Sequence, residues 1–340
     1  MNRKKIVASL LFAILCGNFI TLMAQNKMDA QGRRQGKWVK VDKNNRKIYE
    51  GNFVDGYEVG LFTYYYSDGT VRIKNNFWDK GKMCSHEAYD AKGNLMAKGF
   101  YNQKNKDSVW HLYNDKGILL KTISYKMGTK TGPSVLLDKT GDTLEVQTWN
   151  DDKKHGKWYR RLSNNGYITA EYADDVLNGK YAEYRNDKVV AEGSYDKGLR
   201  AGTWKYYRDS NLEIVEKWAV GNLRERVVLL YSENPQMISI DDIAYFFPKG
   251  PNNTIVITMS GDTIVDKENV QYLYERVGHD HFVTINKEKQ FVAAYRCILG
   301  LGKDEEGNEY LDLEPKLSFN IYPDADCKKL VQSMMREGLE

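Results

Sequence analysis

Apolar and polar residues recur between residues 36 and 226 in a unit of 23 to 25 residues. Each unit opens with a small residue, usually Gly, and an aromatic residue usually follows two positions later. A turn rich in Gly, Asn and Asp separates two alternating runs, and the second run ends in another aromatic residue. Alternation with period two indicates strands, and Asn and Gly tolerate the positive φ of tight hairpin turns. Each unit is therefore predicted to be one β-hairpin.

Eight copies of this unit are present. The clearest start at Gly156, Gly179 and Gly202, and weaker copies start at Gly36, Gly60, Ser85, Ser108 and Gly132. Glu87 and Ser134 stand where the first aromatic residue is expected. The opening glycines and first aromatic residues are the predicted structural positions of the repeat: Gly36, Trp38, Gly60, Phe62, Trp110, Gly132, Gly156, Trp158, Gly179, Tyr181, Gly202 and Trp204.

A lone hairpin is marginally stable in water, so the copies are predicted to stack side by side. The expected fold is mainly β, with eight hairpins forming an elongated antiparallel sheet of about 16 strands. One face of this sheet is expected to be aromatic and the other charged.

The units resemble MORN-type repeats in a degenerate bacterial form, which begins G-K-W-x-x-Y and contains an interrupted E-G-x-Y-x-x-G segment. The clearest matches are Gly179-Lys180-Tyr181 with Glu192-Gly193-Ser194-Tyr195, and Glu50-Gly51-Asn52-Phe53. The resemblance covers about residues 29–226. It implies a non-enzymatic scaffold, since MORN-type proteins mostly bind partner proteins, dimerise or, in some cases, contact membrane lipids. A bacterial branch of similar sequences is described as antitoxins, which act in the cytoplasm.

The first 24 residues conflict with a cytoplasmic role. A basic start, an apolar core and a small residue, Ala24, before the expected cleavage site are typical of a secretory signal peptide. Export predicts a periplasmic, outer-membrane-associated or extracellular protein. The alternative is a lipoprotein signal acylated at Cys16, and the large Leu15 before it argues against lipidation. Gly17 and Asn18 interrupt the apolar run, which argues against a permanent transmembrane helix.

The periodicity ends near Arg226, so the repeat array is assigned to residues 25–230, with a boundary at Glu233-Asn234-Pro235. Residues 236–340 are predicted to form a smaller β-rich or α+β domain. Its apolar or alternating runs, read as five or six strands, include Val270–Val277. A helix is expected at the end, capped by Asp324 or Asp326, with one face formed by Leu330, Val331, Met334 and Met335.

Charge gives no support for nucleic-acid binding. The chain has 50 Lys and Arg residues against 46 Asp and Glu residues, and removing the three basic residues of the signal segment leaves 47 against 46. The links between repeats nevertheless carry basic residues that could form a stripe facing anionic lipid headgroups or glycans, although acidic neighbours dilute it: Arg33, Arg34, Lys82, Lys130, Lys153, Lys154, Arg200 and Arg224.

No motif indicates catalysis. The G-x-S-x-G, H-E-x-x-H and P-loop patterns are absent. His279 and His281 are the best metal candidates if they alternate on a strand, but zinc needs three or four ligands and no spaced partner accompanies them. Cys84, Cys297 and Cys327 are too few for a disulfide framework; the last two could pair or remain buried thiols.

The sequence therefore favours an exported, non-enzymatic scaffold without a cofactor, whose repeat sheet binds another protein of the cell envelope. A surface that binds glycans or membrane headgroups is the alternative. An enzyme in the C-terminal domain is the least favoured hypothesis.

Overall fold

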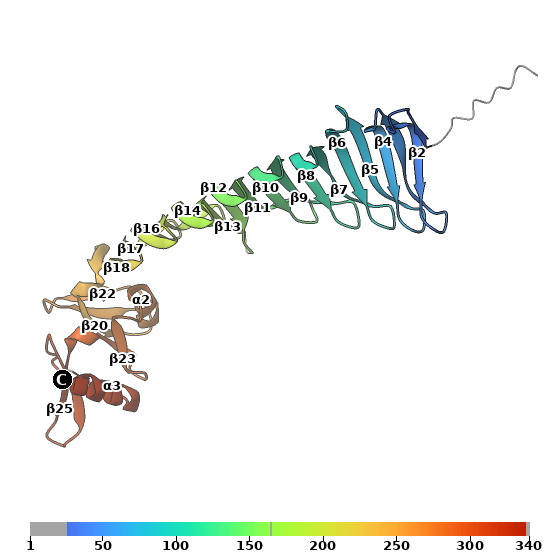
Figure 1. Cartoon of the computed structure of the whole chain (residues 1–340). Coiled ribbons are helices and arrows are strands. Elements are labelled where there is room, and N and C mark those ends of the chain that lie inside the picture. Colours follow the sequence, from blue (N-terminus) through green and yellow to red (C-terminus); the bar gives the residue numbers. More distant parts are fainter. Residues whose placement is uncertain (1–25, 164, 338–340) are drawn as a thin grey trace, which may run out of the picture. The chain divides into compact units, whose positions relative to one another are not determined.

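The computed structural model describes residues 26–163 and 165–337 of the 340-residue chain. Strands β1 to β19 form one antiparallel sheet, and a small region with a terminal helix follows them (Figure 1). The predicted fold class is confirmed. The predicted signal peptide, residues 1–24, with Cys16 and Ala24, lies outside the described residues. No helix within residues 26–337 is long and apolar enough to cross a membrane.

The chain divides into two compact units, with the boundary after Lys153. Unit 1 consists only of strands of the long sheet, and each strand pairs with its neighbours in the sequence. Its strands are β1 (Lys27–Met28), β2 (Arg34–Val41), β3 (Lys47–Val54), β4 (Tyr57–Tyr65), β5 (Val71–Trp78), β6 (Met83–Tyr89), β7 (Leu95–Asn102), β8 (Asn105–Tyr113), β9 (Leu119–Lys126), β10 (Thr129–Leu137) and β11 (Thr143–Asn150).

Unit 2 begins with the remaining strands of the long sheet. They are β12 (Lys153–Arg161), β13 (Gly166–Ala173), β14 (Val176–Arg185), β15 (Lys188–Asp196), β16 (Leu199–Arg208), β17 (Asn211–Ala219), β18 (Asn222–Leu230) and β19 (Gln236–Ser239). The sheet thus extends through β19, past the expected end of the array at residue 230.

The C-terminal region of unit 2 contains a five-stranded antiparallel sheet and a separate hairpin. The sheet has the order β22 (Thr263–Asp266), β21 (Thr254–Thr258), β20 (Ile243–Pro248), β24 (Phe291–Ala294) and β23 (Phe282–Asn286), and the hairpin joins β25 (Ile298–Lys303) to β26 (Glu309–Leu313). Helix α2 (Val270–Val277) precedes β23, and α3 (Ala325–Glu337) ends the described chain.

The prediction of a strand at Val270–Val277 is wrong. The side chain of Asn269 accepts a hydrogen bond from the Tyr272 amide and caps a helix there. Val270, Leu273 and Val277 are buried, and their spacing fits one helical face. A short apolar run does not by itself distinguish a strand from a buried helix.

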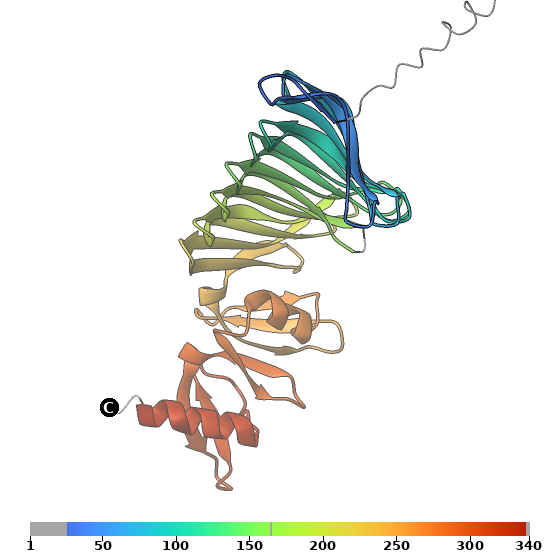
Figure 2. The ribbon, with the colours of Figure 1, turned by 45° about the vertical axis from the view of Figure 1, so that its right-hand side comes forward.

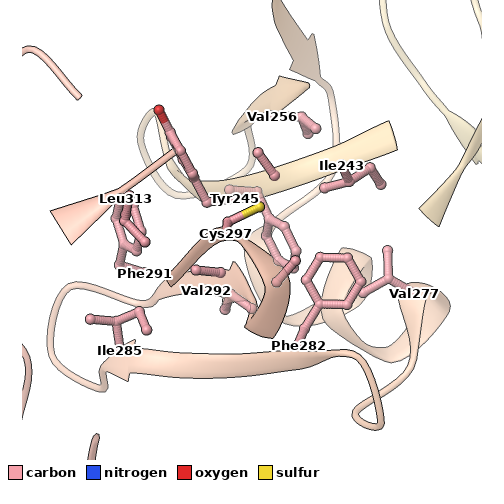
Figure 3. Packing of buried hydrophobic residues seen from close by; sticks show 14 of the residues in the cluster. Ile243, Tyr245, Val256, Val277, Phe282, Ile285, Phe291, Val292, Cys297 and Leu313 are labelled. Atoms are coloured by element: carbon pink, nitrogen blue, oxygen red, sulfur yellow. The ribbon is translucent and has the colours of Figure 1, made fainter. Parts of the chain in front are cut away.

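The C-terminal core packs ring against ring and includes Tyr245, Phe282 and Phe291 (Figure 3). Val228 and Leu230 of repeat strand β18 belong to the same buried cluster. The C-terminal region therefore shares its core with the last repeat strands and is continuous with them across the expected boundary.

The structure decides three details of the C-terminal prediction. Asp324 caps α3, because its carboxylate accepts from the Cys327 amide at 3.0 Å. Val331 is buried as expected, whereas Met335 is 48 % exposed and does not belong to the buried face. Cys297 and Cys327 are both free, buried thiols.

Candidate binding face of the repeat sheet

The aromatic residues at the repeat positions lie on one face of the sheet, here called the ring face. They contact one another edge to face, as in Phe53 with Phe62 at 5.2 Å and Phe62 with Phe77 at 5.3 Å in unit 1, and in Tyr195 with Trp204 at 5.1 Å in unit 2. Such pairs add stabilisation beyond the area they bury. The rings therefore bury one another.

The glycine of the E-G-x-Y segment exists because a ring lies on it. A Cβ atom on Gly193 would be 2.2 Å from the indole of Trp204, and the same overlap occurs at Gly51 with Phe62 and at Gly99 with Trp110. Phe62, Trp110 and Trp204 are accordingly almost completely buried. This pairing of a large ring with the smallest neighbour, here called the packing rule, recurs at three junctions between repeats.

The opening glycines serve a different purpose. Gly36, Gly60, Gly132, Gly156, Gly179 and Gly202 all have φ between +66° and +108°. Only glycine adopts this backbone freely, which explains why it recurs there. Ser108 opens the fourth repeat with φ of +59°, so the backbone geometry is kept even where the residue changes.

In unit 1 the ring face is uncovered. Within the described part of that unit, strands contact their neighbours in the sheet and no second layer packs across the face (Figure 2). Beyond the buried rings, Trp38, Tyr64 and Tyr125 are only half-buried. The face thus offers a continuous surface of partly exposed rings.

Cations from the links lie over these rings. In unit 1, Arg34 is 4.9 Å from the ring centre of Trp38, Lys106 is 4.5 Å from that of Trp110, and Lys130 is 4.5 Å from that of Trp149. In unit 2, Lys154 lies over Tyr172 at 5.3 Å and Arg200 over Trp204 at 4.4 Å. The ring face is therefore both aromatic and cationic.

The predicted basic stripe is realised only in part. Arg34, Lys82, Lys130, Lys154 and Arg200 lie along the ring face. Arg33 instead forms ion pairs with Asp29 and Asp55. Glu58 holds the stripe position of the second repeat, since it pairs with Phe53 as Lys106 pairs with Tyr101. The stripe is therefore interrupted by a carboxylate.

The third repeat begins at Cys84, and the predicted start at Ser85 is wrong. The opening residue of every repeat pairs with the aromatic residue that closes the unit, as Gly60 pairs with Phe77, and here Cys84 pairs with Tyr101. His86, not Glu87, therefore occupies the ring position, where its ring lies 5.2 Å from Tyr101. With Cys84 as a start, Gly36, Gly60, Cys84, Ser108, Gly132 and Gly156 are 24 residues apart.

The third repeat also lacks the bulge of its neighbours. The register shifts where β4 joins β3 and where β8 joins β7, but β6 pairs with β5 without a shift. Cys84 does not adopt positive φ, and the link before it instead contains three such residues, Asp79, Lys80 and Gly81. The third repeat therefore places its extra residue in the turn between β5 and β6, whereas the neighbouring repeats place it in a bulge.

These departures coincide with a cavity of about 370 Å³ on the ring face. It is lined by Glu58, Asn75, Phe77, Gly81, Lys82, Cys84, His86, Tyr101 and Lys104. The imidazole Nδ1 of His86 donates to Asn75 Oδ1 at 2.8 Å. Burial lowers the pKa of His86 and raises the pKa of the Cys84 thiol to about 11. Cys84 is therefore a protonated thiol at neutral pH, which suits packing and not nucleophilic attack.

A second polar cluster joins the last repeats to the C-terminal region within unit 2. Glu213 is buried and accepts hydrogen bonds from the hydroxyls of Tyr231 and Tyr272, while Arg208 forms ion pairs with Glu213 and Glu268. Asp266 and Arg276 form a buried ion pair nearby. An adjacent cavity of about 440 Å³ includes Arg208, Glu213 and Tyr272 in its lining. These charged groups pair with one another, so we interpret the cluster as a structural link between the last repeats and the C-terminal region.

Glu216, buried on β17, was missed by the sequence prediction. Its carboxylate accepts from the Arg226 guanidinium at 2.9 Å and from the Trp218 indole at 2.9 Å. Arg226 takes the position after Trp204 in the row of rings, because it pairs with Glu216 just as Trp204 does. A buried acid opposite an arginine at the end of an array is the signal that could have identified this pair.

The predicted metal candidates do not come together. His279 and His281 precede β23 instead of alternating along it, and His279 stacks on Tyr274 at 4.2 Å. In the described portion of the chain, no group of three or more His, Cys, Asp or Glu side chains could hold a metal ion.

No protein-family model matches the chain, and no curated protein matches it significantly.

Proposed function

We propose that this protein is an exported MORN-type repeat scaffold whose ring face binds another protein of the cell envelope. The uncovered ring face of unit 1 is the observation that carries the proposal. Contiguous rings rimmed by polar groups are typical of protein-binding surfaces, in which Tyr, Trp and Arg are enriched. The regular repeat period supports the MORN-type assignment, and the signal-peptide pattern supports export.

The cations favour a protein partner over a glycan. A sugar stacks on a bare ring, but Arg34, Lys106 and Lys130 already lie over the rings of the ring face in unit 1. Glu58 interrupts the cationic stripe, which weakens the attraction expected for a flat anionic membrane. A protein surface can instead offer carboxylates and apolar groups at matching positions.

Site-specific photocrosslinking in cells tests this proposal with the intact chain. A photoreactive phenylalanine analogue would replace Tyr64 on the ring face, Leu61 on the opposite face or Leu299 in the C-terminal region, one position at a time. Leu61 is the matched control because it lies on the same strand and is 54 % exposed. The intact chain is required because Val228 and Leu230 join the C-terminal core.

One envelope protein captured from position 64 and absent from position 61 is the expected result. Capture from position 299 alone would make the array a spacer and reject the ring face as the binding surface. Failure to capture a protein at all three positions would reject a protein partner. Flotation with anionic liposomes and binding to immobilised glycans would then test the alternative function directly.

A further inference from the structure

In the third repeat, a small imidazole stands where a Trp, Tyr or Phe is usual, and a cavity lies open beside it. His86 stands at the ring position between Asn75 and Gly99, and it is only half-buried. The fifth repeat also lacks its ring, since Ser134 occupies the position. There the neighbours Ile123 and Gln147 close the space, and all three side chains are buried. The chain thus compensates for one missing ring and leaves the other site open.

The cavity presents hydrogen-bond donors. The Asn75 Nδ2 group, the Tyr101 hydroxyl and the side-chain ammonium groups of Lys82 and Lys104 make no hydrogen bond with another residue among those that the structure describes. Both lysines are exposed, and no described carboxylate forms an ion pair with either. Phe77 and Tyr101 supply an apolar wall. These groups fit an acceptor-rich anion attached to an apolar stem.

The net charge around the cavity is positive, which also favours an anion. Lys82 and Lys104 line the cavity and Lys106 lies beside it over Trp110, whereas Glu58 is the single carboxylate in the lining. A volume of about 370 Å³ is at the lower end of ligand-binding cavities and accommodates a side chain better than a folded segment. The excess of lysines selects against cationic side chains.

We infer that this cavity receives a carboxylate side chain from an acidic segment of the bound protein. The inference rests on the proposed function and names the chemistry of the partner. In the bound state the carboxylate accepts from Lys82 and Lys104, and its methylene stem packs against Phe77 and Tyr101. The third repeat thereby fixes the register of the partner along an otherwise periodic face.

Two variants of the full mature chain test the site. Lys82→Glu with Lys104→Glu reverses the charge at the rim. Asn75→Gly with His86→Trp restores the glycine and tryptophan pair that Gly99 and Trp110 form in the next repeat, and so fills the cavity without removing a lysine. Lys92→Glu with Lys116→Glu is the charge-matched control, since both residues are exposed in the hairpin turns of the third and fourth repeats.

The probe is a fluorescein-labelled hexaglutamate peptide, with hexaglutamine as its neutral counterpart, measured by fluorescence anisotropy at low and physiological salt. We expect saturable binding of hexaglutamate alone, at least tenfold weaker binding by both cavity variants, and a change of less than threefold in the control. Circular dichroism melts verify that each variant is folded. The charge-reversed variant keeps the test decisive if the filled variant does not fold.

Three results would overturn the inference. Absence of hexaglutamate binding to the wild-type chain would do so, and so would equal losses in the control and the rim variant, which indicate unspecific attraction. Undiminished binding by a folded, filled variant would show that the cavity is not the site. These results are distinguishable from failure of the proposed function, because photocrosslinking at position 64 reports a protein partner independently of its charge.

Discussion

Gly193→Ala directly tests how a single-layer sheet buries its rings. The new methyl group would lie 2.2 Å from Cδ2 of Trp204, whose ring is 1 % exposed. The indole Nε1 donates to the Ser194 carbonyl at 3.0 Å, and the Arg200 guanidinium lies 4.4 Å from the ring centre, so the ring is held in place. Overpacking costs about 1–3 kcal/mol. Restricting the unfolded chain returns about 0.4–1 kcal/mol, which leaves a net loss of about 1–2 kcal/mol.

The neighbouring repeat supplies the compensating change. Ala170 and Tyr181 occupy the same two positions and pair directly, so Gly193→Ala with Trp204→Tyr recreates a pair that the chain already contains. Trp204→Tyr alone loses the indole hydrogen bond and leaves space above Gly193. We therefore expect the double variant to lose less stability than the sum of the two single variants, by about 0.5–1 kcal/mol.

Urea denaturation of a chain that begins at residue 25, monitored by circular dichroism, measures the free energy of unfolding. Because repeat arrays unfold in parts, hydrogen exchange of peptides within residues 188–208 must report the same order of stability. An unchanged midpoint for Gly193→Ala would show that the strand yields easily to the methyl group. Strict additivity in the double variant would show that ring and glycine volumes are not coupled, and either result would refute the packing rule.

Three further predictions concern single groups. Burial lowers the pKa of His86, so its neutral form contributes stability that is complete above pH 6.5 and declines below it. Between pH 7 and pH 5, the thermal midpoint of His86→Gln should therefore fall less than that of the wild-type chain. Parallel curves of midpoint against pH for the two proteins would contradict this. Arg226→Met should cost about 3–5 kcal/mol in thermal unfolding because it leaves the buried Glu216 without its main partner, and a loss below 1 kcal/mol would contradict a buried ion pair. Trp204→Ala should lower the free energy of unfolding by about 3–5 kcal/mol, and Trp158→Ala by clearly less because Trp158 is only half-buried. Equal losses in urea denaturation would show that the burial of a ring does not determine its contribution to stability.

The hairpin array could be predicted because its physical requirements repeat at the same spacing. Positive φ requires Gly at positions such as Gly60, and a ring such as Trp204 requires a minimal neighbour such as Gly193. The opening glycine recurs in six repeats and the glycine beneath a ring at three junctions, which is often enough to reveal the period. The sixteen strands β2 to β17 and their antiparallel order follow from that period, whereas β1, β18 and β19 extend the sheet beyond it.

The register of the third repeat could not be predicted in the same way. The segment Cys84-Ser85-His86-Glu87 offers neither an opening glycine nor a Trp, Tyr or Phe, so the pattern gives no anchor. Ser85 resembles Ser108 as a small opening residue, which shifts the unit by one position. Pairing with Tyr101 decides the matter, and that is a property of the neighbouring strand.

The boundary of the C-terminal region could not be predicted either, because it also depends on contacts with other segments. Val227 to Leu230 read as the last strand of a periodic array, and nothing local shows that Val228 and Leu230 pack beneath a different sheet. The Glu213 cluster is equally hard to predict, because its partner Tyr272 lies far along the chain, whereas Glu216 has its partners Trp218 and Arg226 close in sequence. Burial of an acid depends on tertiary partners, which one sequence does not reveal.

The two repeats of unit 1 that lack a Trp, Tyr or Phe at the ring position differ in how the space is filled. In the fifth repeat, the Trp149 indole Nε1 donates a hydrogen bond to Ser134 Oγ at 2.9 Å. Gln147 fills the remaining space, although its Oε1 has no hydrogen-bond partner in the described structure. An unpaired buried oxygen costs about 1–3 kcal/mol, so the sheet gives up stability to remain closed there. The third repeat does the opposite, since a larger residue at position 86 would close it and gain contacts. A repeat that stays open where a simple substitution would fill it is best explained by what enters the cavity.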